Sequence, residues 1–219
     1  PPGPSIHAIT FDAGGTLMEC WPSVGHIYSE VAARNGFRDV PVAALNRRFA
    51  LAWRRFKAFR HTREQWAMLV DATFGELVQP PPSVTFFPAL YERFTRAASW
   101  HVFDDVVPTL QSLRARGLKL GVISNWDDRL RPLLRALRLD RSFDVITISC
   151  EVGSPKPRAE IFCEAARALA LPPATILHVG DSRESDFRGA RAAGLQALLL
   201  KRGGGRVRPG EIRSLRALV

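Results

Sequence analysis

The sequence predicts an α/β protein in which a doubly wound parallel sheet carries an inserted all-helical domain. Three observations lead to this fold class. After about residue 102, strand and helix patterns alternate with short connections, which is typical of parallel sheets with helices on both faces. Residues 22–98 show helical periodicity and no convincing strand. One apolar segment, residues 6–11, precedes the helical block and can pair only with strands that follow it.

The first strand is the segment IHAITF at residues 6–11. Four segments follow in which apolar residues recur every three or four positions, as in amphipathic helices. They read SVGHIYSEVAARNGF, VAALNRRFALAWRRFKAF, TREQWAMLVDATFGEL and PALYERFTRAA. We therefore expect residues 1–19 and 100–219 to form one discontinuous core domain, with residues 20–99 as the inserted helical domain.

The second half of the chain repeats a helix-to-strand pattern four times. The pairs are VVPTLQSLRARG with LKLGVIS, DRLRPLLRALRL with FDVITIS, RAEIFCEAARALA with ATILHVG, and SDFRGARAAG with LQALLL. A glycine-rich and arginine-rich loop, KRGGGRVRPG at 201–210, comes next. The final EIRSLRAL is expected to form a short closing helix or turn.

Composition narrows the class of protein. With 46% hydrophobic residues the chain can bury a core, and no apolar run approaches the ~20 residues of a membrane span. The start of the sequence lacks the basic flank and long apolar stretch of a signal peptide. The three cysteines, Cys20, Cys150 and Cys163, form no C-x-x-C pair, which favours free thiols. We expect a cytoplasmic protein that does not bind membranes.

The net charge of +10 does not by itself predict a nucleic-acid partner. Only four of the 31 basic residues are lysines. An arginine excess of this kind is typical of a genome-wide bias in composition and does not by itself indicate a binding surface. No basic run is interleaved with aromatic residues that could stack on bases. We expect no nucleic-acid role, and a weak preference for small anionic substrates.

Polar side chains follow four of the predicted strands. They are Asp12 after the first, Ser124 and Asn125 after the second, Lys156 in the loop GSPKP after the third, and Asp181 and Asp186 after the fourth. Each alone is an ordinary turn, cap or solvated residue. Ligands of open α/β sheets bind beyond the carboxyl ends of the strands, where all of these residues are expected. Two carboxylates can hold Mg²⁺, a lysine and a hydroxyl can bind phosphoryl oxygens, and a carboxylate can act as nucleophile.

These motifs resemble those of the haloacid dehalogenase (HAD) superfamily of hydrolases. ITFDAGGTL is similar to its first motif, GVISN to its second, KP with a following IF to its third, and HVGDSRESDFRGARAAG to its fourth. The resemblance covers nearly the whole chain. It implies a HAD/Rossmann-like core and a helical cap between the first two motifs, as in the helical-cap (C1) subclass.

The resemblance also implies roles for single residues. Asp12 would be the nucleophile and a Mg²⁺ ligand, and Asp181 would be the other side-chain metal ligand. Ser124 would hold the phosphoryl group with Asn125 nearby, and Lys156 would bridge phosphate and nucleophile. Asp186 would orient metal-bound water or Lys156. The implied activity is a Mg²⁺-dependent phosphatase that acts on a small phosphorylated metabolite through an aspartyl-phosphate intermediate on Asp12.

Gly14 departs from the family pattern. The family's phosphatases carry an aspartate there, whose backbone carbonyl binds Mg²⁺ and whose side chain protonates the leaving oxygen and activates water. Gly14 keeps the carbonyl and lacks the acid, a loss typically worth ~10²–10⁴-fold in rate. An acyl or aryl phosphate, which needs little protonation, would tolerate the change. Glu19 and His26, which follow the first motif, are other candidate proton donors.

Three alternatives stay open. A pseudoenzyme could keep the metal and phosphate pocket as a binding or interaction module. A 2-haloacid dehalogenase expels halide without an acid, but that group has tyrosine in place of Gly14 and lacks the pair seen as Gly180 and Asp181. A phosphonoacetaldehyde hydrolase has a small residue at this place and uses a cap lysine, which here could only be Lys57.

Overall fold

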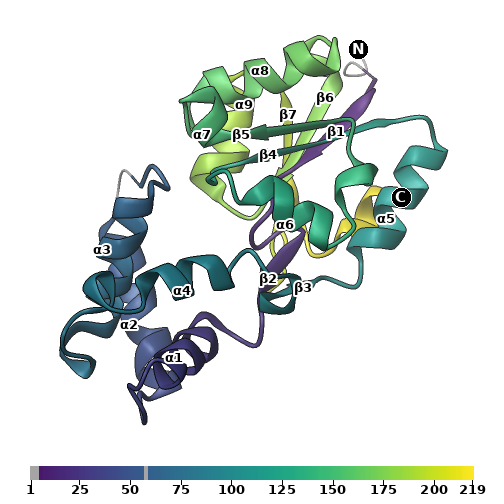
Figure 1. Cartoon of the computed structure of the whole chain (residues 1–219). Coiled ribbons are helices and arrows are strands. Elements are labelled where there is room, and N and C mark those ends of the chain that lie inside the picture. The colour runs from purple at the N-terminus through teal and green to yellow at the C-terminus, as the bar shows by residue number, and fades with distance from the viewer. Residues whose placement is uncertain (1–4, 57–58) are drawn as a thin grey trace. The chain divides into compact units, whose positions relative to one another are not determined.

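The computed structural model describes residues 5–56 and 59–219. The chain divides into two compact units. One comprises the residues up to Met18 together with Val102–Val219, and the other comprises Glu19–His101. The first unit is the α/β core, and the second is a helical unit inserted into it (Figure 1).

A six-stranded parallel sheet forms the centre of the core unit (Figure 1). Its order is β5-β4-β1-β6-β7-β8. The strands are β1 (Ala8–Phe11), β4 (Lys119–Ser124), β5 (Val145–Ile148), β6 (Ile176–Gly180), β7 (Gln196–Leu200) and β8 (Glu211–Ile212). All neighbouring strands pair in parallel. The predicted fold class is confirmed, and the isolated first strand does lie between two strands from the far half of the sequence.

Three strands were not predicted. Glu211–Ile212 was expected to be part of a helix or turn and instead forms β8, which pairs with β7 and is the edge strand of the sheet. The 3₁₀ turn Leu215–Leu218 follows it. Strands β2 (Met18–Cys20) and β3 (Trp100–Val102) form a separate two-stranded sheet. Each has three residues, too few to show an alternating pattern in the sequence.

Helices cover both faces of the six-stranded sheet. In Figure 1, α5 (Val106–Ala115) and α6 (Leu130–Ala136) lie on one side, with α8 (Ala159–Leu169) and α9 (Gly189–Ala192) on the other. The short helix α7 (Ser149–Val152) follows β5, and a π-helical segment, Arg183–Arg188, precedes α9. This arrangement is the doubly wound one that the alternating pattern predicts.

The apolar stripe of α8 shows how the sequence builds this core. Its residues at helical spacing, Ile161, Phe162, Ala165, Ala166 and Leu169, are all buried. They pack in one cluster with Ile123 of β4 and Ile176 of β6. All four residues of β1 are also buried, as expected for a central strand covered on both faces.

The helical unit contains α1 (Val24–Arg34), α2 (Val42–Arg55), α3 (Arg63–Phe74) and α4 (Phe87–Arg93). Two of these helices begin at side-chain caps, where Ser23 and Thr62 accept bonds from backbone N–H groups. Aromatic rings form much of its core, with Tyr28 stacked on Phe74 at a centroid distance of 5.5 Å. Lys57, the candidate cap lysine, lies outside the described residues.

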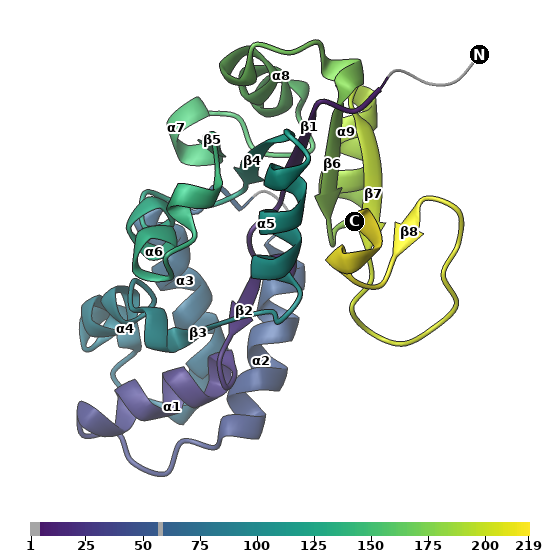
Figure 2. The ribbon, with the colours of Figure 1, turned by 90° about the vertical axis from the view of Figure 1, so that its right-hand side faces the viewer.

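Figure 2 shows the loop at 201–210, in yellow, extending from the sheet edge before the chain returns as β8. Glu211, the first residue of β8, closes this loop because its carboxylate pairs with Lys201 and accepts the Arg208 backbone N–H. Within residues 5–56 and 59–219, no helix has the length and apolar character needed to cross a membrane.

Adjacent valines at the start of α5 test the predicted packing of the core. Val106 is fully buried and Val107 is 45% exposed. We expect Val106→Ala to lower the free energy of unfolding by about 2 kcal/mol, because two buried methyl groups and their contacts are lost. Val107→Ala should change it by less than about 0.5 kcal/mol. Chemical denaturation of both variants measures the difference, and equal losses would contradict the assigned orientation of α5.

Candidate active site

The site lies where the carboxyl ends of three adjacent strands meet. Strand β1 pairs with β4 on one side and β6 on the other, with Phe11 opposite both Val122 and Val179. Asp12 directly follows β1, Ser124 ends β4, and Asp181 directly follows β6. The parallel register therefore brings these three residues to one edge of the sheet.

Lys156 joins the residues that follow β1 and β6. Its Nζ donates to Asp12 Oδ1 at 2.7 Å, to Asp186 Oδ1 at 2.6 Å and to the Ile123 carbonyl at 2.8 Å. Only 5% of Lys156 is exposed. Burial would lower the pKa of Lys156, but the charges of Asp12 and Asp186 outweigh it and raise the pKa. The lysine is therefore a fixed cation.

The carboxylate of Asp12 is bound through one oxygen only. Ser124 Oγ donates to Asp12 Oδ1 at 2.8 Å, and the same oxygen accepts the bond from Lys156. None of the described residues donates a hydrogen bond to Asp12 Oδ2. This second oxygen is available for a metal ion or for nucleophilic attack.

Asn125 holds the loop that carries Lys156. Its Nδ2 donates to the Lys156 carbonyl at 3.0 Å, and its Oδ1 accepts the Lys156 backbone N–H at 2.7 Å. The sequence pattern suggested only that Asn125 lies near the substrate. The structure adds a positioning contact, because both polar ends of the amide engage the lysine's own backbone.

Two buried residues that sequence reasoning missed extend the network into the sheet. His178 lies opposite Thr10 in the β1–β6 register, and its Nδ1 is 3.0 Å from Thr10 Oγ1. Its Nε2 is 3.3 Å from Asp186 Oδ1. Burial lowers the pKa of His178, so the ring is neutral at pH 7 and we assign its proton to Nε2, facing the carboxylate. The sequence held one signal for them. Thr10 and His178 are the polar residues of two otherwise apolar strands, and each lies two or three residues before the acid that follows its strand.

Asp186 is fully committed to protein partners. Besides Lys156 and His178 on Oδ1, its Oδ2 accepts the Ser182 backbone N–H at 2.9 Å. Burial would raise the pKa of Asp186, but the positive charge of Lys156 and the bond from His178 hold it well below its usual range. This geometry suits a residue that orients Lys156.

The carboxylates of Asp12, Asp181 and Asp186 form a cluster suited to a hard cation. One oxygen of each lies within 4.8 Å of the others. Loss of solvent raises the pKa of Asp12, and it raises that of Asp181 to about 7, with the charges of Asp12 and Asp186 adding to the shift. Three carboxylates thus face a single ammonium. A divalent cation with oxygen ligands would balance the remaining charge, and Asp181 could bind it directly.

Two glycines provide the space that the carboxylates occupy. An ideal Cβ on Gly15 would lie 2.4 Å from Asp181 Oδ2. The φ of Gly15 is +74°, a backbone conformation that residues with a side chain rarely adopt, so a substitution would also strain the backbone. A Cβ on Gly180 would lie 2.2 Å from Asp186 Cγ. Neither position can carry a side chain while the adjacent acid stays in place.

Gly14 has a different neighbour. Its φ is not positive, so the backbone itself permits a side chain. A Cβ there would meet the indole of Trp126, at 3.2 Å from Cζ3 and 3.9 Å from Cη2. The alternative proton donors Glu19 and His26 are exposed residues of the helical unit, and the His26 ring bonds Ser23 Oγ at 2.8 Å.

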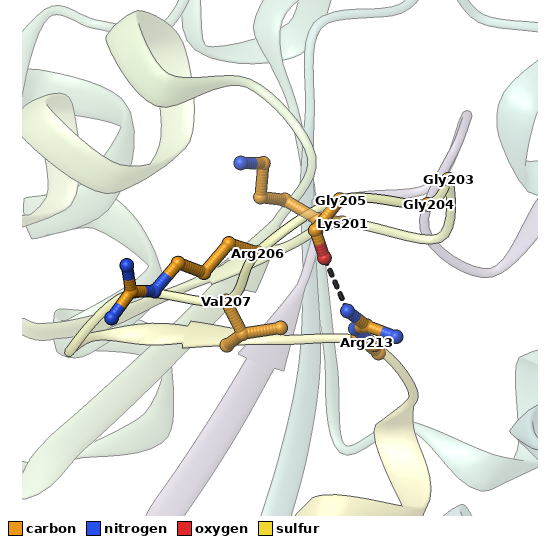
Figure 3. Close-up of a pocket in the computed structure, with 7 residues that line it drawn as sticks. All are labelled: Lys201, Gly203, Gly204, Gly205, Arg206, Val207 and Arg213. Atoms are coloured by element: carbon orange, nitrogen blue, oxygen red, sulfur yellow. Dashed lines mark hydrogen bonds between the residues drawn. The ribbon is translucent and has the colours of Figure 1, made fainter.

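A surface hollow lies apart from these motif residues (Figure 3). It is lined by Lys201, residues 203–205, Arg206, Val207 and Arg213, with Arg213 donating to the Gly205 carbonyl. The loop at 201–210 forms most of it. None of the residues at the strand ends that carry the carboxylates contributes to this hollow.

Gly180 gives a direct test of the close approach of Asp186. We expect Gly180→Ala to lower the free energy of unfolding by about 3 kcal/mol, because the added methyl displaces the carboxylate that pairs with Lys156. Gly203→Ala is the matched control, since a Cβ there has no heavy atom within 4 Å and φ is not positive. It should change stability by less than about 0.5 kcal/mol. Equal denaturation midpoints for the two variants would contradict this geometry.

Comparison with known proteins agrees with this architecture. The family model described as haloacid dehalogenase-like hydrolase matches residues 6–194. The chain is 34% identical over 206 residues to haloacid dehalogenase-like hydrolase domain-containing protein 3 of Bos taurus, covering 89% of this chain and 82% of the relative. It is 29% identical over 209 residues to glyceraldehyde 3-phosphate phosphatase of Methanopyrus kandleri, covering 90% and 85%.

A solved structure shares the fold over almost the whole chain. The HAD phosphatase of Thermococcus onnurineus superposes with a TM-score of 0.71 at 25% identity, covering 97% of this chain and 96% of that one. The family match spans both the strand that precedes Asp12 and the segment that contains Asp186. The chain therefore belongs to the haloacid dehalogenase-like hydrolases.

Proposed function

We propose that this protein is a Mg²⁺-dependent phosphatase that acts on a small phosphorylated metabolite. The observation that carries the proposal is the buried Lys156 ammonium, which binds Asp12 and Asp186 beside Ser124. This arrangement presents one free carboxylate oxygen next to donors suited to a phosphoryl group. The relatives named as phosphatases support the same reaction class.

Asp12 would begin the reaction. Its Oδ2 attacks phosphorus in line with the leaving group, forming an acyl-phosphate bond while the bond from phosphorus to the leaving oxygen breaks. The leaving group takes the electron pair of that bond. Ser124 and Lys156 hold Asp12 through Oδ1 and lie on the side where phosphoryl oxygens would bind. Their donors offset the charge that develops on those oxygens.

Water would complete the cycle. It attacks phosphorus of the aspartyl phosphate, the bond between phosphorus and Asp12 breaks, and inorganic phosphate leaves with the proton released to phosphate or solvent. The Asp12 carboxylate is restored. Asp186 and Asn125 would not contact the substrate. Asp186 holds the Lys156 ammonium in place, and Asn125 holds the Lys156 backbone.

Asp12, Asp181 and the backbone carbonyl of Gly14 would hold Mg²⁺. The carbonyl oxygen of Gly14 accepts no hydrogen bond from the described residues, and Asp181 is exposed beside Asp12. When bound, the ion offsets the repulsion between the carboxylates and an anionic substrate. The assignment of residues 20–99 as a cap and the cytoplasmic location stay predictions.

The first prediction from this mechanism concerns Asp12. We expect the wild-type protein to release phosphate from acetyl phosphate in the presence of Mg²⁺, and to cleave alkyl phosphomonoesters ~10²–10⁴-fold more slowly because residue 14 supplies no acid. Asp12→Asn should reduce acetyl phosphate turnover at least ~10³-fold without changing the unfolding midpoint by more than a few degrees. Phosphate release and thermal unfolding are measured on the same samples.

Asp128→Asn is the control for that experiment, since Asp128 is an exposed carboxylate of the same unit outside the cluster. It should retain wild-type turnover. Equal turnover of wild type and Asp12→Asn would refute Asp12 as nucleophile. A wild-type protein inert on all phosphates would instead direct attention to halide release, to phosphonoacetaldehyde, and to a binding role.

The second prediction concerns the metal. Mg²⁺ at about 100 times its dissociation constant should stabilise the wild type by about 2.7 kcal/mol. Asp181→Asn should remove most of this gain.

Without Mg²⁺ at pH 8, the Asp181→Asn variant should be more stable than wild type, because a like charge beside Asp12 and Asp186 is lost. Below about pH 3, where Asp181 is largely protonated in both the folded and unfolded states, this advantage should disappear. Thermal unfolding with and without Mg²⁺ measures each effect, and a variant that responds to Mg²⁺ like the wild type would contradict the assigned ligand.

A further inference from the structure

Arg202 joins the loop at 201–210 to the turn that follows β1. Its Nη2 donates to the Thr16 carbonyl at 2.7 Å and to Asp105 Oδ1 at 2.9 Å, and its Nη1 donates to Asp105 Oδ2 at 3.0 Å. The guanidinium carbon also lies 3.8 Å from the centroid of the Phe103 ring. Thr16 is fully buried, and the side chains of Arg202 and Asp105 are 20% and 8% exposed. A planar guanidinium can make these bonds together, whereas the ammonium of a lysine cannot.

The turn that Arg202 contacts carries part of the proposed metal site. Thr16 follows Gly15, which lies against Asp181, and it comes two residues after Gly14, whose carbonyl is a proposed Mg²⁺ ligand. The turn is closed by its own backbone, since the Gly15 N–H donates to the Met18 carbonyl at 2.8 Å. Because the turn is held together in this way, a bond that fixes the Thr16 carbonyl also restricts the carbonyl of Gly14.

Asp105 is a fixed partner for the guanidinium. Its Oδ2 also accepts bonds from Ser214 Oγ at 2.6 Å and from the Leu215 N–H at 2.8 Å. Burial would raise the pKa of Asp105, but the bonds from Arg202, Ser214 and Leu215 outweigh it and lower the pKa. The carboxylate is therefore charged at pH 7, and it holds Arg202 against the Thr16 carbonyl.

Phe103 adds a second contact to the same turn. Its backbone N–H donates to the Leu17 carbonyl at 3.1 Å, next to the carbonyl that Arg202 binds, and its ring lies under the guanidinium. Two adjacent carbonyls of the turn are thus held by one cluster, which consists of Phe103, Asp105 and Arg202. Members of this cluster come from both ends of the core unit's second half.

We propose that Arg202 is a positioning residue that fixes the turn after Asp12 in the conformation that binds Mg²⁺. The inference rests on the proposed phosphatase function and adds to it a residue that touches neither the substrate nor the metal. Arg202 holds the Thr16 carbonyl, and Asp105 holds Arg202. Without the guanidinium the turn relaxes, the Gly14 carbonyl is less well placed, and the ion binds less tightly.

The dissociation constant for Mg²⁺ tests this role without any use of activity. It is measured by isothermal titration calorimetry on the whole chain, without substrate and well below the unfolding midpoint. Arg202→Lys keeps a positive charge beside Asp105 but loses the paired bonds, and it should raise the constant about tenfold, as loss of a residue that orients a metal ligand does. A constant equal to that of the wild type in the folded variant would overturn the proposal.

Arg131→Lys is the matched control. Arg131 donates to both carboxylate oxygens of Glu151, at 2.6 and 2.7 Å, and to the Ile146 carbonyl at 2.7 Å. It therefore makes the same kinds of bond as Arg202, but to residues outside the carboxylate cluster. The variant should leave the Mg²⁺ dissociation constant unchanged. Equal increases in Arg131→Lys and Arg202→Lys would overturn the specific role of Arg202.

Asp105→Asn reaches the same contact from its other side. It removes the charge that holds the guanidinium and should raise the Mg²⁺ dissociation constant in the same direction. The double variant with Arg202→Lys should show less than the product of the two separate effects, because both changes act on one contact. If Arg202→Lys does not fold, Asp105→Asn decides the question alone, and an unchanged constant would then overturn the proposal.

Turnover of acetyl phosphate distinguishes positioning of the metal site from a general loss of structure. At a Mg²⁺ concentration that half-saturates the wild type, Arg202→Lys should be slower than the wild type. Its kcat should recover when Mg²⁺ is raised until it saturates the variant. A deficit in kcat that persists at saturating Mg²⁺ would contradict a role through the metal site.

The outcomes also separate this inference from the proposed function. If the wild type is inert on every phosphate but its Mg²⁺ affinity falls in Arg202→Lys, the phosphatase function is overturned and the role of Arg202 stands. If the wild type cleaves acetyl phosphate and the two proteins bind Mg²⁺ equally, only the role of Arg202 is overturned. A wild type that binds no Mg²⁺ would overturn this role together with the metal assignment.

Discussion

The buried ammonium of Lys156 is the interaction on which the site depends. Taking a cation out of water is expensive unless opposite charges and hydrogen bonds compensate it. Here Asp12, Asp186 and the Ile123 carbonyl together provide that compensation. These groups come from three separate chain segments, so the ammonium joins the ends of β4 and β1 to the segment that follows β6. Removing one partner would leave the buried ammonium with fewer compensating groups.

Space is as important to this site as charge. Gly15 and Gly180 have no side chains because carboxylates of the cluster lie where their Cβ atoms would be. At Gly14 the nearest neighbour of an added Cβ would be the indole of Trp126, at 3.2 Å. The cluster of Asp12, Asp181 and Asp186 is present although residue 14 carries no acid.

The absence of an acid at residue 14 has a chemical consequence for the proposed phosphatase reaction. A site with a nucleophilic carboxylate and a fixed ammonium can bind and attack a phosphoryl group, while the departure of the leaving group depends on the substrate itself. Under the proposed mechanism, substrates whose leaving oxygen is a good anion would react in preference to alkyl esters. Specificity would thus come partly from the chemistry of the bond that breaks, and partly from the surface beside it.

Amino-acid order alone determined the α/β class, the inserted helical block, and the set of polar residues at the strand ends. Hydrophobic periodicity and the parallel-sheet rule depend only on local sequence, so these features can be predicted without coordinates. Only the tertiary structure decided that β8 extends the sheet, that His178 and Thr10 support Asp186, that Asn125 holds the Lys156 loop, and that Trp126 lies against Gly14. These contacts join separate segments of the chain, and they depend on strand register and packing, which no local pattern encodes.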